Sequence, residues 1–301
     1  MGLEINIISF IPLLINKKKL NSSESILIYF LFQALASSLL FLLLLRNLIF
    51  YFNFILKKIF ILPILIKIGA APFYIWFPLV IENLTWKISL ILIIWQKLAP
   101  IIILSYLNIK FIKIFIIFSV IIGAIGGLNQ VSLRKIITFS SINHIGWIII
   151  SLTLRNLLWK IYFIIYSFLT YTIILILNNY NLNFLFQIFF FNKKNSIKKL
   201  IIFFNIFSLG GLPPFLGFFP KFIIIQNLVL NYQNTLLIII LFSSLITLYY
   251  YLRIAYSSFL FNFIKIKNYK LNFKKTKLIF ILTLLNFFRF PLIFIIFKFI
   301  N

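Results

Sequence analysis

The sequence predicts an all-α integral membrane protein, a polytopic bundle of about ten transmembrane helices with at least one broken helix. Three observations support this fold class. Hydrophobic residues make up 63% of the 301 residues, and apolar runs of membrane-spanning length recur along nearly the whole chain. Gly-Gly-Leu-Pro-Pro interrupts the longest of these runs, at residues 210–214. A single soluble domain is excluded, because one globular core cannot bury so much apolar surface.

Each apolar run is a candidate membrane helix, since about 20 residues of α-helix cross the hydrocarbon core of a bilayer. The breaks between runs are short and polar, and no linker separates a soluble domain. We therefore expect one transmembrane domain over residues 1–301. The runs after the first break are 26–45, 59–80, 88–107, 114–128, 133–154, 161–177, 200–230, 236–260 and 278–297.

The first run, residues 1–14, is too short to span a bilayer. Glu4 lies twelve residues before Asn16, which corresponds to about 18 Å at the rise of an α-helix. Two interpretations follow. Either the segment lies in the membrane interface, or the first helix is truncated at residue 1 and Glu4 is a mid-membrane carboxylate that could pair with a lysine.

The formal charge of +26 suggests an anionic partner at first sight. Nucleic-acid binding requires a polar, basic face, however, and most of this chain is apolar. When alternate breaks are assigned to opposite sides of a membrane, basic residues fall on one side about twice as often as on the other. Most of the charge is therefore explained by topology and by the lysine-rich codon bias of an AT-rich gene, with the lipid bilayer as a partner and no nucleic acid.

Five basic residues lie inside the apolar runs instead of between them. A lysine at the centre of a membrane helix costs about 2.5 to 3.5 kcal/mol, so such residues should face the bundle interior or a hydrated cavity. Lys67 and Lys97 lie about ten residues into their runs. This corresponds to a depth of roughly 15 Å, at which a lysine side chain cannot easily reach the membrane surface. We expect these two to pair or to function. The five are Lys67, Lys97, Lys221, Arg253 and Arg289.

Lys221 follows the predicted helix break. Two consecutive prolines remove two backbone donors, so the helix should end there, and irregular backbone at membrane depth is tolerated only beside protein or water. Broken helices with a nearby charge mark ion sites in transporters, whereas the alternative is a plain loop between two short helices. His144, the only histidine, could relay protons or be a hydrogen-bonded structural residue. Arg253 is expected at the interface or stacked on aromatic rings, and Arg289 has no assignment.

Several classes of site are excluded by composition. The chain has no cysteine and one histidine, so it holds neither a thiolate metal site nor a multi-histidine site. No phosphate-binding glycine loop, dinucleotide fingerprint or catalytic triad is present. We expect no cofactor in this chain.

Motifs recur in a fixed order from Met1 to about Tyr256. They are Met-Gly-Leu-Glu-Ile-Asn at 1–6, Ser-Phe-Ile-Pro at 9–12, Lys-Ile-Gly-Ala-Ala-Pro-Phe-Tyr-Ile-Trp-Phe-Pro at 67–78, Trp-Gln-Lys-Leu-Ala-Pro at 95–100, Gly-Gly-Leu-Asn-Gln at 126–130, Leu-Arg-Lys at 133–135, the segment 140–147 and the segment 208–221. This ordered set resembles the chain 2 family of mitochondrial NADH:ubiquinone oxidoreductase, the antiporter-like membrane subunits of respiratory complex I. The wording of the motifs is most similar to that of insect members, and the residues after Tyr256 add only hydropathy.

The resemblance implies a multi-pass subunit of the proton-translocating NADH:ubiquinone reductase in the mitochondrial inner membrane. Its partners would be the other membrane-arm subunits, and NADH, flavin, iron–sulfur clusters and ubiquinone would be used elsewhere in the complex. The family's mid-membrane axis implies roles for six residues here. Glu4 would be the carboxylate, Lys67 its paired lysine, Lys97 the central lysine and Lys221 the lysine of the broken helix, with Lys135 and His144 on an accessory polar path.

The chain departs from the family pattern at three positions. Tyr74 replaces a usual His, Leu79 replaces a common Glu after Pro78, and Phe222 replaces a usual Trp. The family's first helix and the start of its second are absent. Two alternatives remain open: a free-standing cation/proton antiporter, which would transport as an isolated chain, and a structural membrane-arm subunit whose lysines serve assembly and not coupling.

Overall fold

The computed structural model describes residues 2–15, 21–49, 59–107, 112–189 and 196–260, and within these ranges the regular elements are helices. A single isolated β-bridge, between Ser132 and Phe184, supplements them in the described part of the chain. The chain forms two compact units. Unit 1 comprises Met1–Gly123 and Ile137–Asn156, and unit 2 comprises Ala124–Ile136 and Leu157–Asn301.

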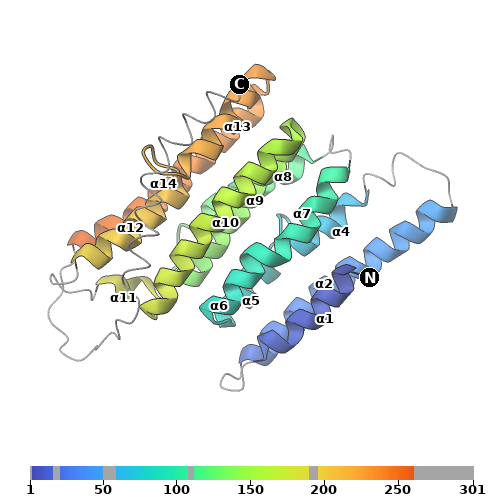
Figure 1. Ribbon diagram of the computed structural model, residues 1–301, viewed down its shortest axis with the longest axis horizontal. Helices are drawn as coiled ribbons and strands as arrows, with labels where there is room; N and C mark the ends of the chain where they lie inside the picture. Colours follow the sequence, from blue (N-terminus) through green and yellow to red (C-terminus); the bar gives the residue numbers. More distant parts are fainter. Residues whose placement is uncertain (1, 16–20, 50–58, 108–111, 190–195, 261–301) are drawn as a thin grey trace. The chain divides into compact units, whose positions relative to one another are not determined.

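Unit 1 is built on contacts of helix α2 with α1, α4 and α5, and of α4 with α7 (Figure 1). A π-helical turn, η1, joins α6 to α7, so that α6, η1 and α7 form one continuous span. The C-terminal end of α8 and the N-terminal end of α9 belong to unit 2. The elements are α1 (Gly2–Leu14), α2 (Asn21–Ile49), α4 (Ile61–Ile68), α5 (Trp76–Asn83), α6 (Trp86–Leu90), η1 (Ile91–Trp95), α7 (Gln96–Tyr106), α8 (Lys113–Gly126) and α9 (Leu133–Leu154).

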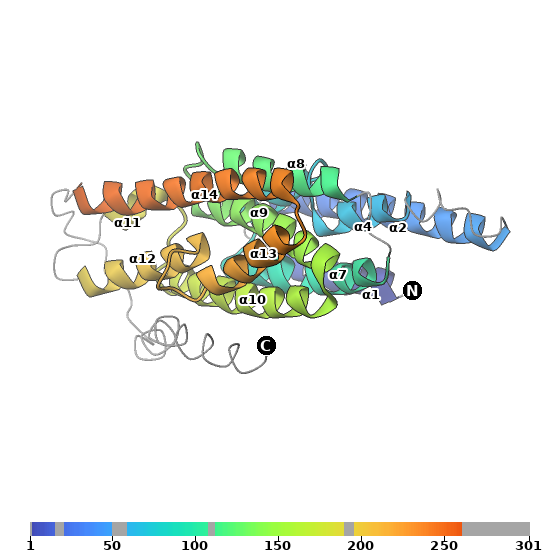
Figure 2. The same cartoon turned by 90° about the horizontal axis from the view of Figure 1, so that it is seen from above.

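Unit 2 is organised around helix α14, which packs against α11, α12 and α13. Figure 2 shows α12 and α13 as separate helices with an irregular segment between them. The elements are α10 (Asn156–Asn179), α11 (Leu185–Phe189), α12 (Ser196–Gly210), α13 (Phe218–Leu230) and α14 (Asn234–Leu260).

The predicted all-α membrane fold is confirmed. Five described helices are long and apolar enough to cross a bilayer, and four more apolar helices are shorter. The run predicted at 133–154 coincides with α9. The number of about ten spans stays a prediction, because the run at 278–297 lies outside the described residues. The five long helices are Ser23–Arg46, Trp86–Tyr106, Leu133–Leu154, Leu157–Asn179 and Asn234–Tyr256.

The run at 59–80 is not one helix, as the sequence had suggested, but two short helices separated by a turn. Helix α4 ends because Gly69 adopts a left-handed conformation, with φ of 75°. The amides of Gly69 and Ala70 both donate to the carbonyl of Leu65, a pattern that closes a helix C-terminus. Pro72 has no amide hydrogen and cannot resume the ladder, so the next helix begins only at Trp76.

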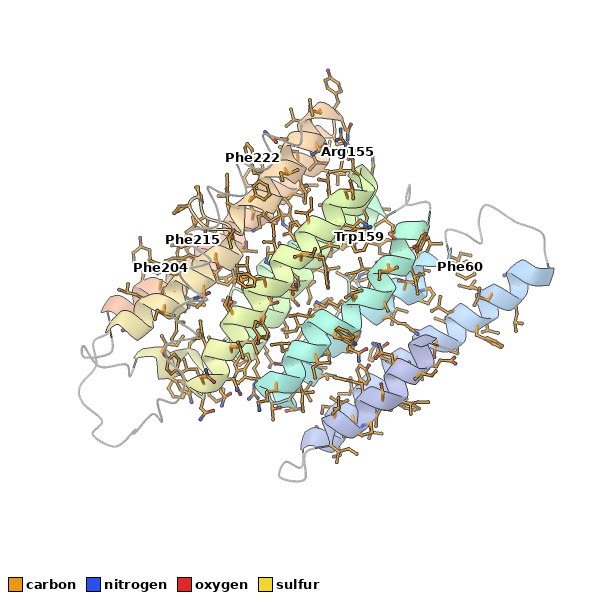
Figure 3. All side chains as sticks on the ribbon, viewed as in Figure 1. Phe60, Arg155, Trp159, Phe204, Phe215 and Phe222 are labelled. Atoms are coloured by element: carbon orange, nitrogen blue, oxygen red, sulfur yellow. The ribbon has the colours of Figure 1, made fainter. Side chains whose placement is uncertain are left out.

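The predicted break in the run at 200–230 is present between α12 and α13. Gly211 adopts a left-handed conformation, with φ of 79°, directly after the last residue of α12. Gly217 lies so close to the carbonyl of Ser208 that a β-carbon would not fit. Figure 3 shows Phe204 and Phe215 beside this break, with ring centroids 5.9 Å apart. The chain therefore turns back tightly on the end of α12.

Helix α9 is the most enclosed of the five long helices, with 94% of an apolar 18-residue stretch buried, against 17% of the corresponding stretch of α2. In unit 1, the β-carbon position of Gly123 would meet the backbone of Asn143. The side-chain amide of Asn143 donates to the carbonyl of Val120 at 3.0 Å. Close packing of α8 on α9 thus places the polar residues of α9 in a protein interior.

Candidate functional site

Lys67 lies in the last turn of α4, directly before the break, and only 6% of its surface is exposed. The negative end of the helix dipole favours a cation at this position. The carboxylate of Glu4, an exposed residue of α1, interacts electrostatically with Lys67. The two residues predicted to form the carboxylate–lysine pair are therefore brought within electrostatic range of each other.

The backbone at this break obtains hydrogen bonds from side chains that do not titrate. The indole N–H of Trp76 donates to the carbonyl of Ile66 at 3.2 Å. The side-chain amide of Gln33, from α2, donates to the carbonyl of Lys67 at 3.4 Å. The carbonyls near the end of α4 are thus supported by Trp76 and Gln33, and the ammonium of Lys67 is not needed for that purpose.

Lys97 lies one residue after the start of α7 and is 2% exposed. In the described part of the chain its ammonium contacts two groups. It donates to the hydroxyl oxygen of Ser141 at 3.2 Å, and it lies 4.4 Å from the ring centroid of Phe77. The Ser141 hydroxyl donates its own hydrogen to the carbonyl of Thr138 at 2.7 Å, so its oxygen is left to accept from Lys97.

The π-helical turn η1 ends directly before Gln96, the residue that precedes Lys97. Such turns replace one α-helical turn with a wider one and recur at functional sites. Gln96 forms a reciprocal amide pair with Asn6 of α1, with distances of 2.8 Å and 3.2 Å. Helix α1, which carries Glu4, is thereby tied to the helix that carries Lys97.

His144 and Lys135, predicted to belong to an accessory polar path, both lie on α9. His144 is 6% exposed and lies three residues after Ser141, on the same side of the helix. It is therefore close to the residue that accepts a hydrogen bond from Lys97. Lys135 lies in the first turn of α9 and is half-buried.

Lys221 of unit 2 is 5% exposed and lies in the first turn of α13. Its ammonium donates to the carbonyl of Gly210, the last residue of α12, at 2.8 Å. A β-carbon on Gly211 would lie 3.0 Å and 3.2 Å from the Cδ and Nζ atoms of Lys221. A glycine at this position therefore permits both the left-handed turn and the approach of the lysine.

The remaining sequence predictions have mixed outcomes. Tyr74, in place of a usual His, packs its ring on Phe139 with centroids 6.2 Å apart. Leu79, in place of a common Glu, is exposed. Arg253 is exposed and donates to the carbonyl of Leu128 at 3.3 Å, and its expected position at the interface or on aromatic rings stays a prediction. Arg289 lies outside the described residues.

Sequence reasoning missed Phe77, Ser141 and the Asn6–Gln96 pair. A phenylalanine in an apolar run gives no sign that its ring faces a cation, and a serine on a helix usually bonds its own backbone. The one available signal was position: Gln96 adjoins the buried Lys97, and an amide beside a charge in a membrane helix is uncommon.

The arrangement is suited to holding and transferring protons. Each buried lysine is an amine that can gain or lose one proton, and hydroxyl and amide groups lie next to Lys97. Among the described residues, no group of three or more His, Asp or Glu side chains is placed to bind a metal ion. The chemistry available from these side chains is acid–base chemistry.

Comparison with known proteins places the chain among membrane antiporter-like proteins. Residues 1–247 match the family described as NADH:quinone oxidoreductase/Mrp antiporter, transmembrane. NADH-ubiquinone oxidoreductase chain 2 of Anopheles gambiae and that of Aedes aegypti are each 50% identical over 271 residues, covering 87% of this chain and 80% of the relative. The Locusta migratoria protein of the same name is 40% identical over 265 residues.

Solved structures share the fold at low sequence identity. Respiratory complex I from Thermus thermophilus with bound aureothin contains a chain with a TM-score of 0.80 and 21% identity, covering 96% of this chain and 73% of that chain. An archaeal membrane-bound sulfane sulfur reductase contains one with a TM-score of 0.80 and 16% identity, covering 97% and 68%. With half of its aligned residues identical to those of the mosquito proteins, the chain belongs to the NADH-ubiquinone oxidoreductase chain 2 family, within the NADH:quinone oxidoreductase/Mrp antiporter transmembrane family.

Proposed function

We propose that this multi-pass membrane protein is a subunit of respiratory complex I that couples electron transfer from NADH to ubiquinone to proton translocation. Family membership supports the assignment to the complex. The enzyme activity belongs to the assembled complex, in which NADH, flavin, iron–sulfur clusters and ubiquinone would be handled by other subunits. We place the chain in the mitochondrial inner membrane, in contact with lipid and with other membrane-arm subunits.

One observation carries the role in proton translocation: three lysines are buried at irregular points of apolar helices. Lys67 precedes the break after α4, Lys97 follows the π-helical turn, and Lys221 follows the break after α12. A lysine at mid-membrane costs about 2.5 to 3.5 kcal/mol. Irregular backbone at the same depth is tolerated only beside protein or water. Neither Lys67 nor Lys97 donates to a helix end in the described residues, so packing alone would favour apolar residues at these two positions.

The proposed mechanism uses the charge of Glu4 as a switch for Lys67. Burial disfavours the charged form of a lysine, whereas a nearby carboxylate favours it, so a change in the Glu4–Lys67 separation changes the proton affinity of Lys67. Lys97 would exchange its proton in turn, with Ser141 holding the amine in place.

His144, one helical turn from Ser141, would offer an acceptor beside Lys97. By motif, Lys221 is the corresponding proton carrier of unit 2, and Lys135 belongs to the accessory path.

The direct experiment replaces Lys97 by Met in complex I and measures protons pumped per NADH oxidised in sealed vesicles. Methionine keeps an unbranched apolar side chain but cannot hold a proton. We expect the complex to assemble and the pumping stoichiometry to fall, because one titrating group of the axis is lost. Lys67→Met should have the same direction of effect. Lys160→Met is the matched control, since Lys160 is an exposed lysine of α10 outside the site.

Two outcomes would contradict the proposal. Unchanged pumping and NADH oxidation in Lys97→Met would remove the coupling role and favour a structural subunit. Proton-coupled cation transport by the purified chain, reconstituted without the other subunits, would favour a free-standing antiporter. Assembly is checked in each variant by native gel electrophoresis, so that loss of the complex is not mistaken for loss of coupling.

A further inference from the structure

The ring of Phe77 lies against the ammonium of Lys97, at 4.4 Å from Nζ to the ring centroid. Phe77 is the second residue of α5 and is fully buried. A cation within about 6 Å of a ring face is attracted by the ring quadrupole, most strongly where water is excluded. The geometry therefore gives Phe77 an electrostatic contact with Lys97 in addition to a packing contact.

This contact matters because no carboxylate of the described residues pairs with Lys97. The described residues include all three acids of the chain, and none of them pairs with Lys97. Glu4 interacts instead with Lys67. Ser141 accepts one hydrogen bond, which the ammonium donates more strongly than a neutral amine would. The ring of Phe77 attracts the cation through its quadrupole, an attraction that a neutral amine lacks. Both groups that touch the amine therefore favour its charged form.

Phe77 also lies beside the break that follows Lys67. A β-carbon placed on Gly69 would lie 3.4 Å from the Cβ and 3.5 Å from the Cγ of Phe77, so little room separates this side chain from the turn. Gly69 is the left-handed residue that ends α4, two residues after Lys67. The same side chain thus lies next to the turn beside one lysine and against the ammonium of the other.

We propose that Phe77 is a positioning residue for proton transfer at Lys97: its ring face holds the ammonium form and links that site to the helix break beside Lys67. When Lys97 releases its proton to a water molecule on the path, one N–H bond breaks and the electron pair stays on Nζ. The ring then loses its cation, while the hydrogen bond to Ser141 can remain. A shift of the Gly69 turn that moves the ring would change the proton affinity of Lys97.

This inference rests on the proposed function for the step it assists, but its test separates the two. The experiment compares Phe77→Leu, Phe77→Tyr and Phe77→Trp in assembled complex I, measuring protons pumped per NADH oxidised and the rate of coupled NADH oxidation. Leucine keeps an apolar side chain without a ring, whereas tyrosine and tryptophan keep a ring face. Phe10→Leu is the matched control, because Phe10 is a buried ring of α1 that packs on Tyr29.

We expect Phe77→Leu to lower the coupled rate by about tenfold, and Tyr or Trp to keep it within about threefold of the parent, as a cation–ring contact predicts. Phe10→Leu should also stay within about threefold. A loss in Phe77→Leu no larger than that in Phe10→Leu would overturn the inference. Equal losses in the aliphatic and both aromatic variants would also overturn it, because they would assign Phe77 to packing alone.

A second measurement does not depend on pumping. Thermal stability of the complex is measured for Phe77→Leu in the parent and in Lys97→Met. A cation–ring contact predicts that Phe77→Leu lowers the melting temperature less when the ammonium is already absent, and additive shifts would contradict the contact. Failure of the proposed function would appear instead as normal pumping in Lys97→Met. The comparison of melting temperatures can still support or overturn the contact in that case.

Discussion

The two helix breaks, one in each unit, solve the same backbone problem with different groups. Both begin at a left-handed glycine, Gly69 or Gly211, and both leave a helix C-terminus beside a buried lysine. At the first break, Trp76 and Gln33 donate to the freed carbonyls. At the second, Lys221 itself donates to the carbonyl of Gly210.

At the first break, the lysine is not one of the donors that support the backbone. At the second break, the lysine is itself such a donor. Lys67 can change its protonation or move without removing a donor from the backbone. Lys221 cannot move away from Gly210 without leaving a carbonyl that must find another donor. The second site should therefore be less tolerant of substitution than the first.

The largest effect is expected from Gly211→Ala. A residue with a β-carbon pays about 1 to 2 kcal/mol in the left-handed region, and here the added carbon also displaces the side chain of Lys221. Gly69→Ala has the same conformational cost, but its β-carbon would lie 3.4 Å from Cζ2 of Trp76 and from Cβ of Phe77, at the edge of ordinary contact distance. Thermal inactivation of assembled complex I should be faster in Gly211→Ala than in Gly69→Ala, and the reverse order would contradict the comparison.

An intermediate effect is expected from Lys221→Met compared with Lys67→Met. The first change removes a donor from the Gly210 carbonyl, which costs about 1 to 3 kcal/mol if the carbonyl stays unsatisfied. The second change leaves the donors of Trp76 and Gln33 in place. Both variants should lose pumping, but only Lys221→Met should also lower the melting temperature by several degrees. Equal melting temperatures would show that the lysine is not a structural donor.

The smallest effect is expected from Trp76→Phe, which tests the first break alone. Phenylalanine keeps a ring but lacks the indole N–H that donates to Ile66. The loss should be about 0.5 to 1.5 kcal/mol in stability, the usual net value of one hydrogen bond. Pumping per NADH should be retained, because Lys67 is untouched. A selective loss of pumping at unchanged stability would mean that the indole acts on Lys67 and not on the backbone.

The sequence was sufficient to predict the membrane fold, the second break and the burial of the lysines, because each has a strong local signal. Helix α9 coincides with its apolar run, and the Gly-Gly-Leu-Pro-Pro segment contains several helix-ending residues together. Lys67, Lys97 and Lys221 could be located because a charge in an apolar run is expensive wherever the helix packs.

The first break was missed because its run is apolar apart from Lys67 and its helix-breaking residues are spread along it. Gly69 and Pro72 are not adjacent, and single Gly and Pro residues are tolerated within membrane helices. The partners of Lys97 were missed for a different reason. Phe77 and Ser141 reach it from other helices, α5 and α9, and hydropathy along the chain carries no information on which helices meet.

Within the part of the chain that the structure describes, Lys97 is held by a ring and a hydroxyl and not by a carboxylate, and this has a consequence for distant groups. A lysine paired with an acid presents its surroundings with a dipole, whose field decays steeply. A lysine held by a ring and a hydroxyl presents a whole unit charge, which appears on protonation and disappears on release. At an effective dielectric constant of about 20, two unit charges about 10 Å apart interact by about 1.7 kcal/mol, more than a tenfold change in an equilibrium constant. The proton state of Lys97 is therefore a signal that charged groups can sense without touching it.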